Sequence, residues 1–568
     1  MSGRRGRAGP SGRWFLGSLV VLAFSASPAP SQVSQALAEA EIDLLAEAPD
    51  DNFGWSVANA GDVNGDGYAD VIVGAIYNDS AATDAGKAYV FLGGPQFSTT
   101  PFVTMTGMAA NDQFGVSVGG AGDFNGDGYA DVIVGARLNS LNGNAAGAAF
   151  IYFGGPAMDG NPDVILLGEA ADDWFGNSVA GAGDVNGDGY SDVIVGAPYN
   201  DRGGSAAGAA YLFFGGPPLD NAPDVILVGE MHDDQFGWSV AGAGDTDGDG
   251  RSDVIVGARL HCVDKVLCLG NDYARGRAYL FRGGSPMDAI PDVVLNGDAA
   301  NDWFGNTVAG IGDVNGDSRA DIAVGAIYAD PVVNATVLSA AGTTSIYFGG
   351  SPMDAVRDVL LPGEQANGQS GWAIAPAGDV DGDGRADFWM TAHFYDDGLN
   401  TSAGKIYLFQ GGTRIGPLPR ATAVGEGQNV QMGQSIAGGD VSGTGGLADG
   451  IVGEVYSRDV GSGSGKAFVL SPFCVGLSVD PSSISWAACG SFNAFNLYRG
   501  SVRSDLPLGS YGTCALSGLP GGSVPEGTAP PSLGDAFFYL ITGRTALLEG
   551  ALGFNSSGAL RRNASPCP

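Results

Sequence analysis

One stretch of sequence recurs seven times in this chain, and this recurrence constrains the fold more than any other feature. The clearest copy reads FGNSVAGAGDVNGDGYSDVIVGAPYND and spans residues 175–201. Each copy contains an acidic loop that begins at an aspartate. Successive loop starts lie 61, 61, 61, 68, 66 and 61 residues apart, at Asp62, Asp123, Asp184, Asp245, Asp313, Asp379 and Asp440. This regular period predicts one supersecondary unit that is repeated seven times.

Each copy contains four short apolar segments of strand length. In the third copy they span residues 177–185, 192–197, 209–214 and 224–228. They are rich in β-branched and aromatic residues and are bounded by Gly, Asp, Asn or Pro, which is typical of strands. No segment has a sustained helical period. Seven four-stranded units predict an all-β chain folded as a seven-bladed β-propeller, because the coils of the rival β-solenoid are much shorter.

The order of the segments also predicts how the ring closes. A fourth-strand segment precedes every Phe-Gly position, but none follows the last third-strand segment at 465–471. A matching segment, EIDLLAEA, lies before the first repeat at 41–48. We therefore expect this N-terminal strand to complete the seventh blade, since unpaired sheet edges promote aggregation.

The ends of the chain differ from the repeats. Arg4, Arg5 and Arg7 precede an apolar run from Trp14 to Phe24, and small residues and prolines follow it. This order is typical of a secretory signal peptide, and the run is shorter than the ~20 residues of a membrane span. The predicted organisation is a signal peptide at 1–31, a linker at 32–40, the propeller at 41–472 and a small disulfide-containing β-sandwich-like domain at 473–568.

Charge and cysteine content narrow the functional classes. A net charge of −36 disfavours nucleic acid and anionic membrane surfaces as partners, while 44% hydrophobic residues argue against disorder. An even number of cysteines in an exported chain favours disulfides over free buried thiols. Cys262 and Cys268 lie together in an insertion of the fourth repeat and are expected to pair. Four others allow three connectivities: Cys474, Cys489, Cys514 and Cys567.

Six of the seven loops follow the pattern D-x-[D/N]-x-D-G-x-x-D. Alternate side chains converge on one point, the glycine permits the turn, the seventh residue offers its carbonyl and the ninth aspartate offers both carboxylate oxygens. The predicted ligands at positions one, three, five, seven and nine are Asp62, Asn64, Asp66, Tyr68 and Asp70; Asp123, Asn125, Asp127, Tyr129 and Asp131; Asp184, Asn186, Asp188, Tyr190 and Asp192; Asp245, Asp247, Asp249, Arg251 and Asp253; Asp313, Asn315, Asp317, Arg319 and Asp321; and Asp379, Asp381, Asp383, Arg385 and Asp387.

An all-oxygen set of this kind favours calcium over magnesium, which prefers fewer and more rigid ligands. Without a counter-charge, twenty clustered aspartates would repel one another and raise each other's pKa. The alternative is a set of solvated turns, which six aligned copies make less favoured. We predict about six calcium ions.

Two loops depart from the pattern. Ser318 replaces the turn glycine of the fifth loop. The seventh loop offers only Asp440 and Asp449 as carboxylates, so we expect the seventh loop to hold no metal or to bind it very weakly.

The chain also resembles a known repeat. Phe175-Gly176 and the later Gly196-Ala197-Pro198 are similar to the FG-GAP repeat, which builds the seven-bladed propeller of integrin α-subunits and of related bacterial exported proteins. The resemblance covers about residues 41–472. It implies calcium in loops on one face of the ring and ligands on the other. The departures are in the proline and in the Phe-Gly pairs of the last two copies: Ile76, Arg259, Ser370-Gly371 and Met432-Gly433.

Successive turns of an antiparallel meander alternate between faces, so the other loops lie opposite the acidic ones. They vary most, especially at 260–277 and 328–342, and variable loops on a rigid scaffold favour recognition. Arg259, Lys265, Arg275 and Arg277 form a basic cluster suited to an acidic partner group. The predicted function is a secreted or cell-surface adhesion or recognition module, monomeric, with an extracellular protein or glycan as ligand and with no transmembrane segment.

The alternative is a secreted polysaccharide- or ester-processing enzyme that uses the propeller as a scaffold. The chain lacks a Gly-x-Ser-x-Gly elbow, a zinc-helix motif and a phosphate loop. Its three histidines, His232, His261 and His393, stand alone in variable loops, where we expect solvated side chains. Enzymatic activity is therefore the less favoured prediction.

Overall fold

A computed structural model describes residues 41–262, 274–443 and 449–470, together with the backbone of eight short strands outside these ranges. The chain divides into two compact units, one of residues 41–472 and one of residues 1–40 and 473–568. The described residues contain strands and turns but no α-helix. Among them, accordingly, no helix has the length and apolar character needed to cross a membrane.

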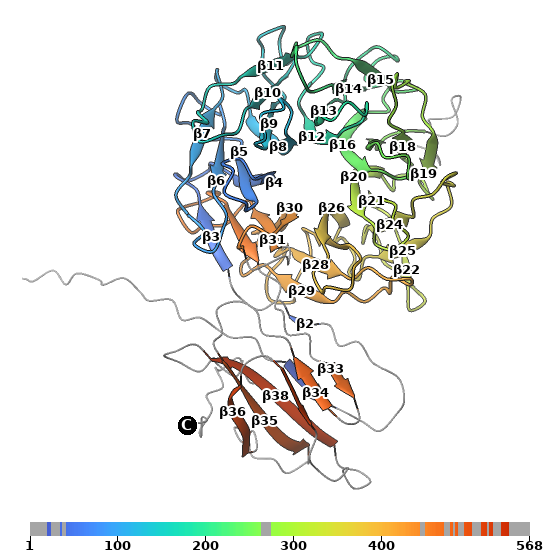
Figure 1. Cartoon of the computed structure of the whole chain (residues 1–568). Coiled ribbons are helices and arrows are strands. Elements are labelled where there is room, and N and C mark those ends of the chain that lie inside the picture. Colours follow the sequence, from blue (N-terminus) through green and yellow to red (C-terminus); the bar gives the residue numbers. More distant parts are fainter. Residues whose placement is uncertain are drawn as a thin grey trace, which may run out of the picture. The chain divides into compact units, whose positions relative to one another are not determined.

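Residues 41–472 form seven antiparallel four-stranded sheets arranged around a common axis, with the first strand of each sheet nearest the centre (Figure 1). The first four blades are continuous in sequence. They comprise β4 (Phe53–Gly61), β5 (Asp70–Ala75), β6 (Lys87–Phe91) and β7 (Val103–Thr106); β8 (Phe114–Gly122), β9 (Asp131–Ala136), β10 (Ala148–Tyr152) and β11 (Val164–Leu167); β12 (Ser178–Gly183), β13 (Asp192–Ala197), β14 (Ala209–Phe213) and β15 (Val225–Val228); and β16 (Phe236–Gly244), β17 (Asp253–Ala258), β18 (Arg277–Phe281) and β19 (Val293–Asn296).

Blades 5 to 7 complete the ring. Blade 5 also carries a two-stranded hairpin, β22 (Val332–Val333) with β23 (Thr336–Val337). The blade strands are β20 (Phe304–Gly312), β21 (Asp321–Ala326), β24 (Thr343–Tyr347) and β25 (Val359–Pro362); β26 (Ser370–Gly378), β27 (Asp387–Ala392), β28 (Lys405–Phe409) and β29 (Ala421–Val424); and β30 (Met432–Gly439), β31 (Asp449–Glu454), β32 (Lys466–Leu470) and β3 (Glu41–Leu45). The predicted seven-bladed propeller is thus confirmed.

The hydrophobic core lies between adjacent blades. Every residue of the second strands is buried, as in the DVIVGA sequence of β13, whereas an outer strand such as β7 alternates buried and exposed residues. This pattern follows from position, because a second strand is covered by neighbouring blades on both faces and an outer strand on one. The Phe-Gly phenylalanines join this core: Phe175 is 1% exposed and packs edge-on against Tyr211 at 5.3 Å. Ser370 and Met432 are buried at the same position of blades 6 and 7.

The N-terminal strand closes the ring as predicted. β3 pairs antiparallel with β32, with Ile42 opposite Val469 and Leu44 opposite Ala467. A parallel bridge also joins Phe53 to Gly465, as Gly147 is joined to Phe175 between blades 2 and 3. The first and last blades therefore make the same contact as every other adjacent pair.

The second unit contains two described sheets, with strand orders β1-β38-β35-β36 and β33-β34-β37. Most of the predicted signal peptide and linker, together with Cys268, Cys474, Cys489 and Cys567, lies outside the described residues. The predictions of a signal peptide, a sandwich-like domain and disulfides therefore stay predictions. The strands are β1 (Val20–Ala23), β2 (Gln35–Ala36), β33 (Ser478–Asp480), β34 (Ser483–Trp486), β35 (Ala494–Val502), β36 (Thr513–Leu519), β37 (Gly522–Pro525) and β38 (Ala536–Arg544).

Candidate cation loops and the opposite face

The acidic loops connect the first and second strands of each blade, so they gather on one face of the ring. The first aspartate organises its loop through backbone amides. The Oδ1 atom of Asp62 accepts hydrogen bonds from the amides of Gly65 at 2.7 Å and Asp66 at 3.0 Å, and its Oδ2 atom accepts one from Gly67 at 2.8 Å. The first aspartates of the next five loops repeat these contacts.

The ninth aspartate is buried and joins the loop to the sheet. Asp70 accepts a hydrogen bond from the amide of Val63 at 2.9 Å and another from Gly93, after the third strand, at 2.8 Å. Burial raises the pKa of this carboxyl to about 6, and burial raises the pKa of Asp131 to about 7. Desolvated carboxylates with raised pKa values are sites where a cation restores the charged form.

The third and fifth residues complete the oxygen set. In loop 1 the Asn64 amide donates to Asp66 at 2.9 Å, which holds both side chains together. In loop 4, carboxylate oxygens of Asp245, Asp247 and Asp249 all lie within 4.8 Å of one another, and the same holds for three aspartates of loop 6. Oxygen-only donor sets of this kind suit a hard cation such as calcium, so the residues present fit the expected ion.

In loops 1 to 6 the seventh residue also reaches the loop before it in the ring. A Cβ atom on Gly65 would lie 2.6 Å from the Tyr129 ring, and one on Gly126 would lie 2.2 Å from the Tyr190 ring. Tyr68 occupies the same place over Gly443 of the seventh loop. Side chains at position seven therefore interlock neighbouring loops around the ring, a contact that the sequence pattern alone does not reveal.

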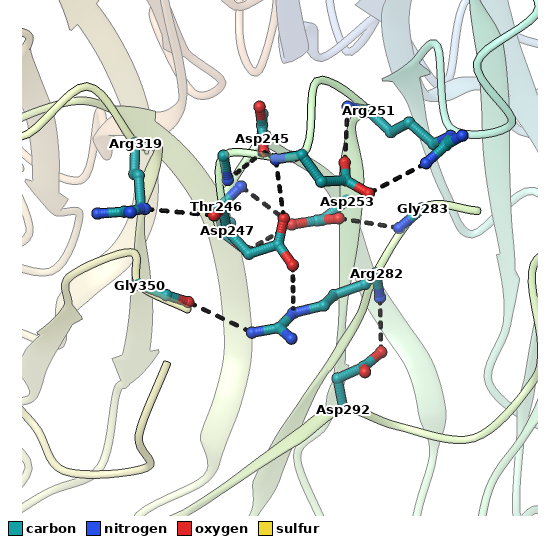
Figure 2. Close-up of polar contacts among 12 residues, drawn as sticks. Asp245, Thr246, Asp247, Arg251, Asp253, Arg282, Gly283, Asp292, Arg319 and Gly350 are labelled. Atoms are coloured by element: carbon teal, nitrogen blue, oxygen red, sulfur yellow. Dashed lines mark hydrogen bonds and ion pairs between the residues drawn. The ribbon is translucent and has the colours of Figure 1, made fainter. Parts of the chain in front are cut away.

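Loop 4 has arginine partners that sequence analysis did not foresee (Figure 2). The side chain of Arg282, which follows β18, forms an ion pair with Asp247 at 3.3 Å, and Arg251 donates to Asp249 at 3.1 Å. Arg319 of the next blade donates to the carbonyl oxygen of Asp247 at 3.3 Å. In loop 6, Arg420 pairs with Asp381 at 2.9 Å and Arg385 with Asp383 at 2.9 Å.

The two irregular loops keep part of the pattern. Ser318 has a φ of 69°, so it adopts the left-handed backbone that glycine prefers, and its amide still donates to Asp313 at 2.7 Å. In the seventh loop, Asp449 is buried and accepts from the amide of Ser442 at 2.7 Å. Residues 444–448 of that loop lie outside the described residues.

On the opposite face, blades 1 to 5 share an aspartate that lies two residues before the phenylalanine of the Phe-Gly pair. In blade 3 the Asp173 carboxylate accepts a hydrogen bond from the Asn200 amide at 2.7 Å, and blades 1 and 2 have the same pair. In blade 4, His261 takes the place of the asparagine and lies 3.0 Å from Asp234. This histidine therefore belongs to a structural contact that is common to four blades.

Two of the three histidines correct our expectation of solvated side chains. His261 is 1% exposed and His393 is 2% exposed. His393 packs against Trp372 with ring centroids 3.7 Å apart, and burial lowers its pKa to about 3. Sequence analysis missed this because both histidines follow strands that the neighbouring blades cover. His232 is exposed, as expected, and lies 3.1 Å from Asp233.

Two arginines on this face pack against aromatic rings and have no carboxylate partner among the described residues. The guanidinium carbon of Arg259 lies 3.0 Å from the centre of the Trp238 ring and 4.7 Å from that of Trp303. Arg137 lies 5.1 Å from the Trp174 ring. Burial lowers the pKa of Arg259 to about 10, which reflects incomplete solvation of the charge.

The predicted basic cluster around the insertion is only partly described, because residues 263–273, including Lys265, lie outside the described ranges. Arg277 pairs with Glu230 at 3.0 Å and also contacts Asn296, so its charge is balanced. Arg259 turns toward Trp238 and Trp303 instead. Arg137 and Arg259 thus contact aromatic rings where Arg277 contacts a carboxylate.

These features define the class: a seven-bladed propeller, five of whose blades match the FG-GAP repeat. The family described as FG-GAP repeat matches residues 53–91, 114–152, 175–213, 236–281 and 370–409, which are blades 1 to 4 and blade 6. Blades 5 and 7, which lie outside these ranges, have the same strand order and the same bridges to their neighbours.

Its relatives include integrin α-subunits and a phospholipase. The chain is 34% identical to integrin alpha-5 of Xenopus laevis over 228 residues, which are 37% of this chain and 20% of that protein. It is 38% identical to integrin alpha-IIb of Mus musculus over 26% of this chain and 15% of that protein. Human phosphatidylinositol-glycan-specific phospholipase D is 25% identical over 63% of this chain and 46% of its own length. The chain therefore spans less than half the length of each.

Proposed function

We propose that this chain is a secreted, calcium-binding FG-GAP propeller that acts as a recognition module for an extracellular protein or glycan. The observation that supports calcium most strongly is the repetition of one loop geometry in six blades, each with converging oxygen donors and a buried ninth aspartate. Side chains at positions one, three, five and nine and the carbonyl at position seven would hold the ion. When bound, the ion would neutralise the carboxylates and fix each loop to its blade.

The experiment for this part is metal analysis of the purified full chain. About six calcium ions per chain are expected after dialysis against buffer with micromolar free calcium. Magnesium should not replace calcium at equal concentration, because it prefers near-ideal octahedral coordination and retains its waters. Replacement of Asp188, which lies at position five of loop 3, by alanine should remove about one ion.

The face opposite the acidic loops is the proposed recognition surface. Arg259, Trp238 and Trp303 support it, because Arg and Trp are enriched at the energetic centres of protein interfaces. An arginine without a carboxylate neighbour favours an acidic group on the ligand. A screen of matrix proteins and acidic glycans, with and without calcium, tests this assignment. The ligand found should lose about tenfold or more in affinity with Arg259→Gln, whereas Arg357→Gln, which removes an exposed pair with Asp298, should bind normally.

The second candidate is a secreted hydrolase, and similarity to a phospholipase D over 63% of this chain favours it. The similarity covers 46% of that protein, so its activity does not transfer by itself. His261 and His393 are buried in structural contacts, which leaves His232 as the exposed histidine of the described residues. Turnover of phosphodiester, ester or polysaccharide substrates that survives His232→Ala but not metal removal would favour a loop-based enzyme over a recognition module.

A further inference from the structure

The six acidic loops fall into two types that differ at the third position. Loops 1, 2, 3 and 5 have asparagine there, and loops 4 and 6 have aspartate. In the asparagine type, the side-chain amide donates to the fifth-position aspartate. The donor–acceptor distances are 2.9 Å from Asn64, 3.0 Å from Asn125, 2.8 Å from Asn186 and 3.3 Å from Asn315. Comparison of the two loop types within this chain therefore shows how the fifth-position aspartate is contacted with and without an asparagine at position three.

Arginine replaces the missing amide in the aspartate type. Arg251 of loop 4 and Arg385 of loop 6 each donate to the fifth-position aspartate of their own loop, at 3.1 Å and 2.9 Å. Loop 5 is the informative control, because it has Arg319 at position seven but Asn315 at position three. The backbone amide of Arg319 donates to its own Asp317 at 3.0 Å, but its guanidinium group donates to the carbonyl oxygen of Asp247 in loop 4 instead, at 3.3 Å. The seventh-position arginine turns to its own loop only where the third residue is an aspartate.

A second arginine pairs with the third-position aspartate itself. Arg282 stands where blade 3 has Phe214, and it pairs with Asp247 at 3.3 Å. Arg420 pairs with Asp381 at 2.9 Å. The Arg282 and Asp247 side chains are 25% and 14% exposed, and those of Arg420 and Asp381 are 17% and 18% exposed. Partial burial strengthens such pairs relative to fully exposed ones.

The backbone shows that Arg420 is a substitution at a defined place. Its amide donates to the carbonyl of Leu408, as the amide of Asp163 donates to that of Ile151 in blade 2. Blades 2 to 5 have an aspartate at this place, and it accepts a hydrogen bond from the residue after the third strand. Blade 6 thus has the basic Arg420 where blades 2 to 5 have an aspartate, and Arg420 lies next to a loop with Asp381 at its third position.

An asparagine-type loop gathers three carboxylates, whereas loops 4 and 6 each gather four. Three guanidinium groups contact loop 4, from Arg251, Arg282 and Arg319, and two contact loop 6, from Arg385 and Arg420. A calcium ion entering loop 4 is repelled by Arg251 and Arg282 and competes with them for oxygens of Asp249 and Asp247. The guanidinium groups also satisfy these carboxylates when no ion is bound. Repulsion and competition weaken calcium binding. Because the guanidinium groups pair with the carboxylates, the order of the loop depends less on the ion.

We propose that loops 4 and 6 form a second class of calcium site, in which paired arginines lower the affinity and keep the loop ordered at low calcium. Loops 1, 2, 3 and 5 are the tight class, and their order depends on the ion. This inference rests on the proposed calcium function and adds a regulatory range to it. The ring then has blades whose loops empty first as calcium falls.

The test is calorimetric titration of the calcium-stripped full chain. The wild type should show two classes of site, with two ions in the weaker class. Arg282→Gln combined with Arg420→Gln should tighten the weaker class by about threefold to tenfold, as expected for loss of one half-buried repulsive charge per site. Arg202→Gln is the control, because Arg202 pairs with Glu169 at 2.5 Å on the opposite face.

A second variant guards against misfolding of the first. Asp247→Asn with Arg282→Phe copies the Asn186 and Phe214 pair of loop 3, so it should move one ion from the weak to the tight class. Terbium luminescence sensitised by tyrosine gives a separate readout, since tyrosine occupies position seven in loops 1 to 3 and arginine does so in loops 4 to 6. Sensitised emission should saturate before the last two sites fill.

The outcomes are distinct. Six equal sites in the wild type, or weaker binding after Arg282→Gln, would overturn the two-class proposal and leave calcium binding intact. No calcium binding at all would overturn the proposed function and this inference with it. Two weak sites that tighten only in the arginine variants would support both.

Discussion

Gly196 of the second strand in blade 3 lies directly against Gly237, the glycine of the next Phe-Gly pair. A Cβ atom on Gly196 would stand 2.1 Å from the carbonyl oxygen of Gly237. Gly237 has a φ of 83°, so a side chain is disfavoured there as well. The two glycines of the FG-GAP signature are therefore the two sides of one contact, through which each blade packs on the next.

We predict that Gly196→Ala lowers the free energy of unfolding by about 3 kcal/mol, because backbone atoms cannot yield to the new methyl group as a side chain can. Blade 6 supplies the control, because Thr391 occupies the place of Gly196 and its side chain already fits against Gly433 of the next blade. Thr391→Ala should cost much less. Equal losses for the two variants in denaturant unfolding would contradict this account of the signature.

The second prediction concerns ring closure through β3. A chain that starts at residue 50 lacks the strand that pairs with β32, so the edge of β32 becomes exposed. The residues that pack against Leu44, which is 1% exposed in the intact ring, become exposed as well. We expect this chain to aggregate or form oligomers through the open edge. Size-exclusion chromatography measures the outcome, with a chain starting at residue 40 as control. Equal stability and a monomeric state for both would argue against closure by exchange.

The third prediction concerns Asp302, whose carboxyl accepts a hydrogen bond from the backbone amide of Ala299 at 2.9 Å. It lacks the side-chain amide partner of blade 3, because blade 5 has Ala329 where blade 3 has Asn200. Burial raises the pKa of Asp302 to about 6. The folded state thus binds the proton more tightly than the unfolded state, so the stability contribution of Asp302 falls as pH rises from about 4 to 6.

Ala329→Asn should restore the hydrogen bond and lower that pKa. We expect a gain of about 1–2 kcal/mol at pH 7 that disappears below about pH 4, where the carboxyl is protonated in both states. Unfolding curves of both chains in saturating calcium across this pH range measure the difference. A gain that does not change with pH would point to packing rather than to the carboxylate.

The sequence predicted the fold well because the period, the strand pattern and the missing fourth strand are local signals. It located the oxygen donors of the acidic loops for the same reason. It did not predict the arginine pairs: Arg282 and Arg420 lie 35 and 39 residues after the aspartates they contact, outside the loop pattern. The signal that was present was the change from asparagine to aspartate at the third position.

The burial of the histidines was missed for a related reason. His261 follows the second strand of blade 4, where blades 1 to 3 have asparagine, and alignment of these copies would have indicated its partner Asp234. His393 has no such precedent, because its contact with Trp372 is specific to blade 6. A contact that occurs in one blade only leaves no repeat signal in the sequence.

Thermal unfolding of the full chain with and without chelator measures whether calcium in the acidic loops stabilises this propeller. At free calcium tenfold above a site's dissociation constant, each site contributes about 1.4 kcal/mol. We expect a large fall in melting temperature when excess chelator is added. Added calcium should restore the melting temperature fully, but an equal concentration of magnesium should not. A melting temperature that does not change with chelator, in a chain that metal analysis shows to have lost its calcium, would contradict this expectation.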